Sequence, residues 1–218
     1  MTKPAPSTEE NPGRILAAAR QLILEQGIGA LSVRKLAEAS GLALRTIYNL
    51  YGNKESVLIA LFETGTRALD LAMDRLEAAM TRSPWKTEFY LEWIDQVESM
   101  LLENQALIKP ALIAGFSPLP PPQAIRIHQR RIRRLKDALV LAARQDLIWA
   151  DLDLDVCARL IYTNYFNVVA EWARGDIDDH TLIVHGRYAI LTILHTLINA
   201  PDRRENALNL LRALTEEK

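Results

Sequence analysis

Five polar side chains stand at helical spacing in LALRTIYNLYGNKESVL, a segment from Leu42 to Leu58 that is rich in Leu, Ile and Tyr. They are Arg45, Thr46, Tyr48, Asn49 and Lys54. An Arg side chain can bond guanine through two hydrogen bonds, and an Asn side chain can do the same to adenine. Hydroxyl groups and Lys can hold phosphate oxygens. This set of groups therefore suits recognition of double-stranded DNA.

The periodicity of a short helix here sorts these side chains by direction. At 100° per residue, one face collects the residues that we expect to pack on the two preceding helices: Ala43, Ile47, Leu50 and Tyr51. Arg45 and Asn49 point away from that face, where they can reach base edges in a major groove. Thr46 and Tyr48 lie on the flanks, where they can reach phosphates. The plainer alternative is the solvated polar face of an ordinary amphipathic helix.

The rest of the pattern is also helical, and the chain is expected to be all-α. The sequence of 218 residues holds only nine Gly and ten Pro, and β-type alternation is hard to find. Start and stop signals such as Asn11-Pro12, Gly27 and Gly52-Asn53 place the element ends. The expected helices cover about residues 12–26, 33–39, 43–51, 54–81, 84–103, 105–115, 123–146, 153–174, 179–198 and 201–216.

The second and third of these helices are joined by a short turn. Ser32 is expected to cap the second helix, and the turn SGL, residues 40–42, separates it from the third. Two helices joined by a short Gly-containing turn are typical of a helix-turn-helix, whose second helix enters the major groove. Arg34 and Lys35 add positive charge to a helix N-terminus, which already favours anions.

The predicted helix-turn-helix and its flanking residues carry a family resemblance. The segment ALSVRKLAEASGLALRTIYNLYGNKESVL closely resembles the N-terminal DNA-binding domain of TetR-family bacterial transcription regulators. The matching residues are Ser32-Val33-Arg34, Leu36-Ala37, Ala39-Ser40-Gly41, Thr46-Ile47-Tyr48, Tyr51 and Asn53-Lys54-Glu55. The resemblance spans about 45 residues, from Ile15 to Leu58, with the motifs in the family's order.

The resemblance implies a set of DNA contacts. Three side chains are implied to hold phosphates: Thr46, Tyr48 and Lys54. Three are implied to lie nearest the bases: Leu44, Arg45 and Asn49. Ser32 and Arg34 complete the predicted DNA site. Two residues depart from the family pattern. Ala43 removes a capping hydroxyl, and Arg45 replaces a small residue, so Arg45 can hold a phosphate instead of reading a base.

Composition and charge limit the other possibilities. The net charge is −1, with 49% hydrophobic and 24% charged residues, which is ordinary for a globular protein and unlike a nucleic-acid-coating polycation. Seven basic and five acidic residues through Glu55 give that region +2. The single cysteine, Cys157, excludes an intrachain disulfide. We expect neither a signal peptide nor a membrane span. The sequence therefore predicts a cytoplasmic location.

The predicted domains are a tail at 1–10, a helix-turn-helix DNA-binding domain at 11–63 and a larger helical domain for effector binding and dimerisation at 64–218. The segment from His185 to Ile198 is apolar around most of its circumference, which favours burial on both sides. The resemblance implies that the helices at 153–174 and 179–198 form a homodimer interface, and a twofold dimer matches a palindromic operator. The alternative is a thick monomer core.

The helix at 123–146 carries both an apolar stripe and a run of cations. The stripe consists of Ile125, His128, Ile132, Leu135, Leu139 and Ala142. The cations are Arg126, Arg130, Arg131, Arg133, Arg134 and Lys136. They form either a solvated face or a surface for an anionic ligand or DNA backbone. The resemblance places an effector cavity among the middle helices, with an expected lining of Trp93, Met100, Phe116 and His128 that suits an apolar or aromatic effector. His128 can equally be a satisfied core histidine.

Catalysis has no supporting motif. DIDDH, residues 176–180, fits a loop with Asp178 or Asp179 as a helix N-cap better than a metal site. We therefore expect no enzyme, no metal and no cofactor. The prediction is a homodimeric repressor that binds a DNA operator and is released by a small-molecule effector. The alternatives are a regulator without an effector, an activator, or a helical binding protein or enzyme without DNA binding.

Overall fold

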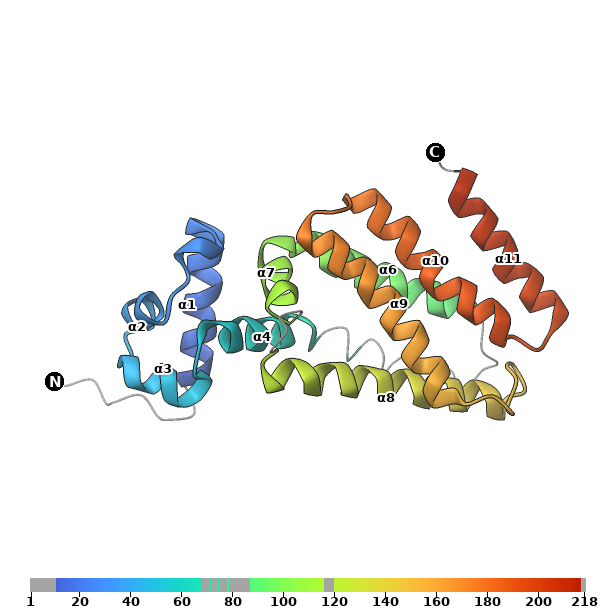
Figure 1. Cartoon of the computed structure of the whole chain (residues 1–218), viewed down its shortest axis with the longest axis horizontal. Helices are drawn as coiled ribbons and strands as arrows, with labels where there is room; N and C mark the ends of the chain where they lie inside the picture. Colours follow the sequence, from blue (N-terminus) through green and yellow to red (C-terminus); the bar gives the residue numbers. More distant parts are fainter. Residues whose placement is uncertain are drawn as a thin grey trace. The chain divides into compact units, whose positions relative to one another are not determined.

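The computed structural model describes residues 11–67, 71, 74, 78, 87–115 and 120–216, except for the side chains of 87–93, 203, 215 and 216. Figure 1 shows its elements in chain order. They are α1 (Asn11–Gln26), the 3₁₀ helix η1 (Ile28–Ala30), α2 (Val33–Ser40), α3 (Leu44–Tyr51), α4 (Lys54–Gly65), α6 (Thr87–Glu103), α7 (Gln105–Gly115), α8 (Pro122–Arg144), α9 (Leu154–Arg174), α10 (Asp179–Leu197) and α11 (Pro201–Glu216).

The prediction of an all-α chain is confirmed. The regular elements of the described residues are helices, joined by one isolated bridge between Ile148 and Ile198. Helices α2, α3 and α7 to α11 lie within two residues of their predicted ranges. The tail at 1–10 and the end of the predicted 54–81 helix lie largely outside the described residues.

The predicted extent of the fourth helix is wrong. Helix α4 ends at Gly65, and Thr66 forms a turn before the next helical residue, Arg67. The Thr64 hydroxyl donates to the Ala60 carbonyl at 2.9 Å, a local bond that competes with the helix backbone and bends helices. Glycine directly after it lowers helix propensity further. The single helix expected over about residues 54–81 is therefore interrupted at Thr66.

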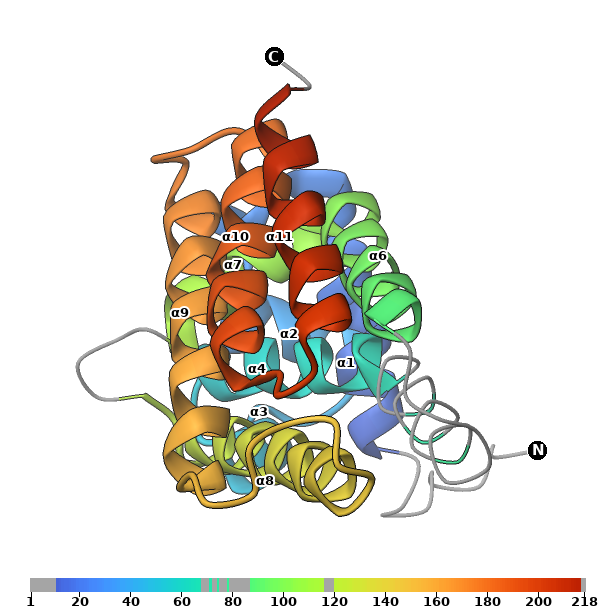
Figure 2. The ribbon, with the colours of Figure 1, turned by 90° about the vertical axis from the view of Figure 1, so that its right-hand side faces the viewer.

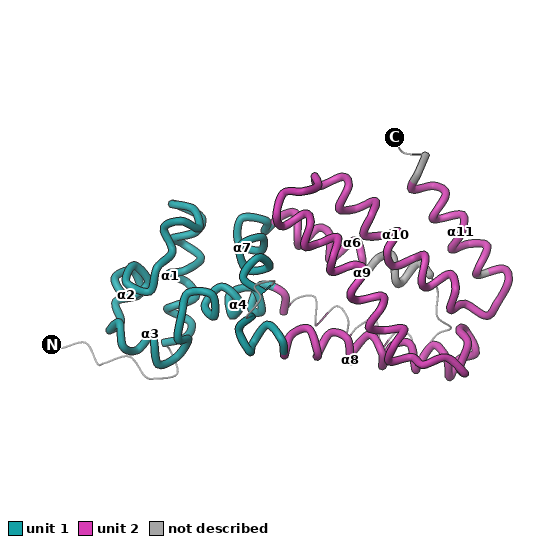
Figure 3. The backbone as a smooth tube through the Cα atoms, in the orientation of Figure 1, with its two compact units in different colours: residues 1–65, 104–125 teal, residues 66–103, 126–218 magenta. Residues whose placement is uncertain are grey.

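The chain forms two compact units, coloured separately in Figure 3. Unit 1 consists of residues 1–65 and 104–125, and unit 2 of residues 66–103 and 126–218. Unit 1 thus includes α7 besides the first four helices. The functional assignment of 11–63 to DNA binding and of 64–218 to effector binding and dimerisation stays a prediction.

Unit 1 is built around α1, which packs against α2, α4 and α7. Its core holds the fully buried side chains Ile15, Ala19, Leu36, Ile47 and Val57. Ile47 is the buried residue of α3, and Tyr51 packs partly buried against the same core. Burial of these apolar side chains fixes α3 against the unit.

Glycine forms the turn between α2 and α3. Gly41 has φ 65° and ψ 30°, a left-handed conformation that residues with a Cβ rarely adopt. Its N–H donates to the carbonyls of Ala37 and Glu38, and the Leu42 N–H donates to Ala37 at 3.2 Å. This is a Schellman motif, which satisfies carbonyls that the end of α2 would otherwise leave unbonded.

In unit 2, α10 lies between α9 and α11 (Figure 2). At Gly186 an added Cβ would stand 2.9 Å from Cε2 of Tyr165, so α9 and α10 approach each other closely there. Trp172 is fully buried, and its Nε1 donates to Asp179 Oδ1 at 2.7 Å across the α9–α10 corner. Asp178 caps α10 by accepting from the Thr181 N–H at 2.8 Å, which confirms the predicted cap in DIDDH.

Helix α8 corrects the predicted apolar stripe at its first turn. Ile125 is 45% exposed, whereas the neighbouring Ala124 and Ile127 are buried. Leu139 and Ala142 are buried as expected. The buried line of α8 therefore starts one to two residues away from the predicted stripe.

The N-terminus of α3 gives the first testable prediction. Ala43 has the extended backbone of an N-cap residue but no side chain that accepts a hydrogen bond. We expect Ala43→Ser to raise the free energy of unfolding by about 1 kcal/mol, seen as a melting temperature about 2–4 °C higher.

The matched control is Ala17→Ser, on the exposed side of α1. It should lower stability by about 0.5 kcal/mol because Ser is a poorer helix former inside a helix. Equal effects at the two positions would contradict the capping argument.

Candidate nucleic-acid interface

Helix α3 presents most of its surface to solvent. Arg45 and Asn49 are exposed, Tyr48 is 52% exposed and Thr46 is half-buried. Only Ile47, at 1%, is fully buried in this helix. The predicted outer ridge and flanks are therefore free to meet a ligand.

Two residues of the predicted buried face, Leu50 and Ala43, lie differently from the predicted wheel. Leu50 is 39% exposed, so it does not belong to the buried face. Ala43 is exposed and precedes the helix as its N-cap. Leu44 is 44% exposed, which leaves its side chain accessible on the outer side as the DNA assignment requires. Helix α3 has only eight residues and packs against a small core. It therefore buries a narrow strip around Ile47 rather than a broad face.

The start of α2 carries the second group of predicted contacts. The Ser32 hydroxyl oxygen accepts from the Lys35 N–H at 3.2 Å, so Ser32 caps the helix as predicted. A hydroxyl can accept and donate at once, so this cap leaves the O–H of Ser32 available for an acceptor such as phosphate. Arg34 is 87% exposed and pairs with Glu38 at 3.2 Å. An exposed i, i+4 pair is worth only a few tenths of a kcal/mol, which a phosphate can displace.

The start of α4 completes this surface. Gly52 has φ 75° and ends α3, and Asn53 Oδ1 accepts from the Ser56 N–H at 2.8 Å. Asn53 therefore caps the N-terminus of α4. Lys54, the first residue of α4, is exposed there. A cation beside the positive end of a helix favours an anion at this point.

The predicted effector residues are placed less completely. Phe116 and the side chain of Trp93 lie outside the described residues. Met100 is half-buried on α6. His128 on α8 contacts two rings of α9: its Nδ1 lies 2.5 Å from the Tyr162 hydroxyl, and its ring centroid lies 4.4 Å from that of Phe166. These contacts give one ring nitrogen of the half-buried His128 a hydrogen-bond partner.

Burial controls ionisation in this cluster. It lowers the pKa of His128 to about 4, helped by the nearby charge of Arg131. It raises the pKa of Tyr162 to about 12. Both rings are therefore neutral at pH 7, and the phenol can donate to the imidazole. Sequence reasoning passed over Tyr162 and Phe166, although their i, i+4 spacing on one helix predicts a shared face.

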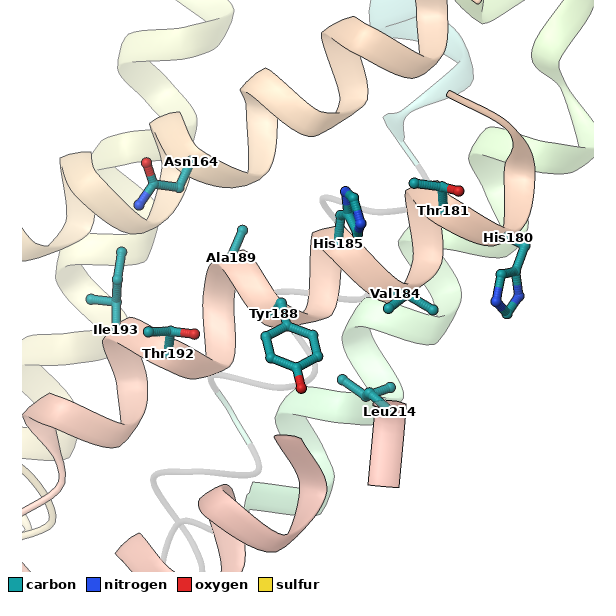
Figure 4. A pocket seen from close by; sticks show the side chains of 10 residues that line it. All are labelled: Asn164, His180, Thr181, Val184, His185, Tyr188, Ala189, Thr192, Ile193 and Leu214. Atoms are coloured by element: carbon teal, nitrogen blue, oxygen red, sulfur yellow. The ribbon is translucent and has the colours of Figure 1, made fainter. Parts of the chain in front are cut away.

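An open groove of about 770 Å³ runs along α10 (Figure 4). Most of its lining comes from successive turns of α10, with Asn164 of α9 and Leu214 of α11 at its sides. The polar α10 side chains in it are His180, Thr181, His185, Tyr188 and Thr192. Met100 and His128 are not among its lining side chains.

Metal-binding clusters and membrane-spanning helices are absent from the described part of the chain. No group of three His, Cys, Asp or Glu side chains there could hold a metal ion. Within the same residues, no helix combines the length and apolarity needed to cross a membrane.

A helix-turn-helix whose second helix exposes polar residues, beside two capped helix N-termini with cations, is an arrangement typical of DNA-binding proteins. Residues 15–61 match the model of the family described as bacterial regulatory proteins, tetR family. This match to the N-terminal part of the chain supports a TetR-family transcriptional regulator.

Similar proteins agree with this assignment. The uncharacterized HTH-type transcriptional regulator YdeS of Bacillus subtilis is 28% identical over 163 residues, which cover 74% of this chain and 79% of YdeS. The fold is similar to that of Thermus thermophilus FadR, a TetR-family repressor solved with lauroyl-CoA, at a TM-score of 0.69 and 19% identity, covering 87% of this chain and 97% of FadR. It is also similar to SmeT, the repressor of the Stenotrophomonas maltophilia efflux pump SmeDEF, at 0.63 and 19%, covering 89% and 93%.

The His128 cluster predicts a pH dependence of stability. The pKa of His128 in the folded chain, about 4, is below the ordinary 6.5, so the unfolded chain binds the extra proton between these values. The stability that neutral His128 contributes is present above pH 6.5 and is lost as the pH falls toward 4.

The measurement compares unfolding free energies of the wild type and His128→Gln, which removes the titration but can still bond Tyr162. Their difference should shift by about 2–3 kcal/mol in favour of the variant between pH 7 and pH 4. It should stay constant from pH 7 to pH 9. Parallel curves over the whole acid range would show that His128 protonates as easily as in the unfolded chain.

Proposed function

We propose that this regulator is a homodimeric repressor that binds a palindromic operator and is released by an apolar small molecule. The observation that carries the DNA-binding part is the outward ridge of α3, where Arg45 and Asn49 are exposed directly opposite the buried Ile47. A ridge of this kind enters a major groove with its base-reading side chains foremost.

The remaining contacts follow from position. Thr46 and Tyr48 flank the ridge and donate to phosphates on either side of the groove. Leu44, at 44% exposure, is available to contact a thymine methyl group. Phosphates also meet Lys54 at the start of α4.

Two further phosphate contacts come from the start of α2. Ser32 and Arg34 stand at its N-terminal end, where backbone N–H groups favour an anion. Phosphate contacts on both sides of α3 fix its depth and register in the groove, whereas the ridge supplies sequence preference.

The exposed side of α9 and α10 supports dimerisation. Val156 is 49% exposed and Leu160 is 51% exposed, one helical turn apart on α9. Exposed apolar residues on successive turns of a helix are favoured contacts for a partner protein. The open groove along α10 offers a concave surface of mixed character beside Asn164 of α9. A twofold dimer through these helices presents two copies of α3, which read half-sites about 34–36 Å apart.

The release step rests on a difference in affinity. A small molecule that binds one conformation of unit 2 more tightly than another shifts the population toward it, and DNA affinity changes by the same coupling energy. FadR with lauroyl-CoA and SmeT with triclosan are structures of similar fold that hold molecules with large apolar parts. They support an apolar effector for this chain, with the unit 2 residues Trp93, Met100 and His128 as proposed lining residues.

The DNA site is tested by two substitutions on α3, measured on a duplex that the wild-type protein selects from a random-sequence pool. Arg45→Ala should weaken binding by about 10- to 100-fold, because a bidentate base contact is worth about 1–3 kcal/mol. Tyr48→Phe should weaken it by about tenfold through loss of one bond to a charged phosphate. Arg20→Ala, an exposed cation on α1, is the control and should change little.

The same experiment decides what Arg45 contacts. A base contact changes the preferred base at one position of the half-site. A phosphate contact weakens all sequences alike and lowers the slope of log affinity against log salt by about one. Unchanged affinity in both α3 variants would refute the groove assignment.

The dimer interface is tested by Leu160→Glu. A charge on the exposed apolar line of α9 should convert the dimer to a monomer in analytical ultracentrifugation, because it would be buried without a partner. The matched control is Leu24→Glu on α1, since Leu24 is similarly exposed at 55%. A dimer that survives Leu160→Glu would place the interface elsewhere.

A further inference from the structure

One hydrogen bond links the first turn of α1 to the turn of the helix-turn-helix. Nη2 of Arg14 donates to the carbonyl oxygen of Ser40 at 2.5 Å, across 26 positions of sequence. Ser40 is the last residue of α2, and the guanidinium is part-buried at this contact. A cation bonded to the final carbonyl of a helix meets the negative end of the helix dipole.

The guanidinium also packs against the turn itself. A Cβ built on Gly41 would stand 3.1 Å from Nη2 of Arg14, closer than most such contacts. Glycine at position 41 therefore meets two requirements. It allows the φ of 65°, and it leaves room for the guanidinium of Arg14. Arg14 therefore bonds the turn at the Ser40 carbonyl, and the Schellman hydrogen bonds close the turn.

Helix α3 depends on this turn for its position. Its N-cap, Ala43, offers no side-chain hydrogen bond, so the end that carries Leu44 and Arg45 has no polar anchor of its own. Ile47, one turn further on, is the first fully buried side chain of the helix. The start of α3 is thus tied to unit 1 through residues 41–43 and the Arg14–Ser40 bond.

We infer that Arg14 is a positioning residue for the recognition helix: it fixes the α2–α3 turn, and through it the angle at which α3 is presented, without touching DNA. This inference rests on the proposed DNA-binding function of α3. Its guanidinium is directed to the Ser40 carbonyl, which distinguishes Arg14 from exposed cations such as Arg34 and Lys54.

The first test uses the full chain and the duplex selected by the wild-type protein. Arg14→Gln should weaken binding by about tenfold, at a temperature where both proteins are folded, with the salt slope unchanged. Arg14→Lys keeps a cation that can bond one carbonyl and should recover most of the loss. Arg20→Gln removes an equal charge from the exposed side of α1 and is the matched control.

The second test needs no DNA. Amide hydrogen exchange of residues 41–46 should accelerate in Arg14→Gln, whereas exchange of Ala18 to Ile23 in the middle of α1 should not change. This local response separates positioning from a general loss of stability, which would accelerate exchange throughout unit 1.

Three results would overturn the inference. A salt slope lowered by about one would make Arg14 a direct phosphate contact. Unchanged affinity in Arg14→Gln would remove its role in presenting α3. Uniform acceleration of exchange across unit 1 would reduce it to a stability residue. If the wild-type protein selects no duplex, the proposed function fails. Hydrogen exchange at residues 41–46 still decides whether Arg14 holds the turn: local acceleration in Arg14→Gln supports this role, and no acceleration contradicts it.

Discussion

The burial of one isoleucine determines the outward surface of α3. This helix has eight residues, too few for independent stability, so tertiary contacts must hold it. Ile47, at 1% exposure, joins the unit 1 core, and burial of such a side chain contributes about 1.5–3 kcal/mol. Once Ile47 points inward, Arg45 and Asn49 must point outward. The DNA assignment depends on this rotation.

Turns and caps fix the helix ends, which burial of the core side chains alone does not position. Gly41 and Gly52 take positive φ at the two ends of α3, and Asn53 caps the helix that follows. In unit 2 a different device operates, because Gly186 allows Tyr165 to press against the α10 backbone. Polar bonds such as Trp172 to Asp179 then fix the corner between α9 and α10. Unit 1 therefore uses glycine turns and a cap at the ends of α3, whereas unit 2 uses a close glycine contact and a directed hydrogen bond between α9 and α10.

Much of this architecture could be predicted from the sequence, because helix signals are local. Pro, Gly and Asp at element ends placed the boundaries, and the period of Ile47 and Tyr51 predicted the rotation of α3. Features that depend on tertiary contact were missed. The exposure of Leu50 and Ile125 and the pairing of His128 with Tyr162 are examples. The Arg14–Ser40 bond spans 26 positions and leaves no periodic trace in the sequence.

The central claim is that two copies of α3 read DNA as a symmetric pair. The most direct measurement is selection of bound duplexes from a random-sequence pool by the full-length protein, followed by sequencing and mapping of guanine N7 methylation interference. The account predicts an inverted repeat whose half-sites are centred about one helical turn, or a multiple of it, apart. Interference should fall in the major groove of each half-site. Enrichment of no sequence, or of a single unrepeated motif without major-groove interference, would contradict it.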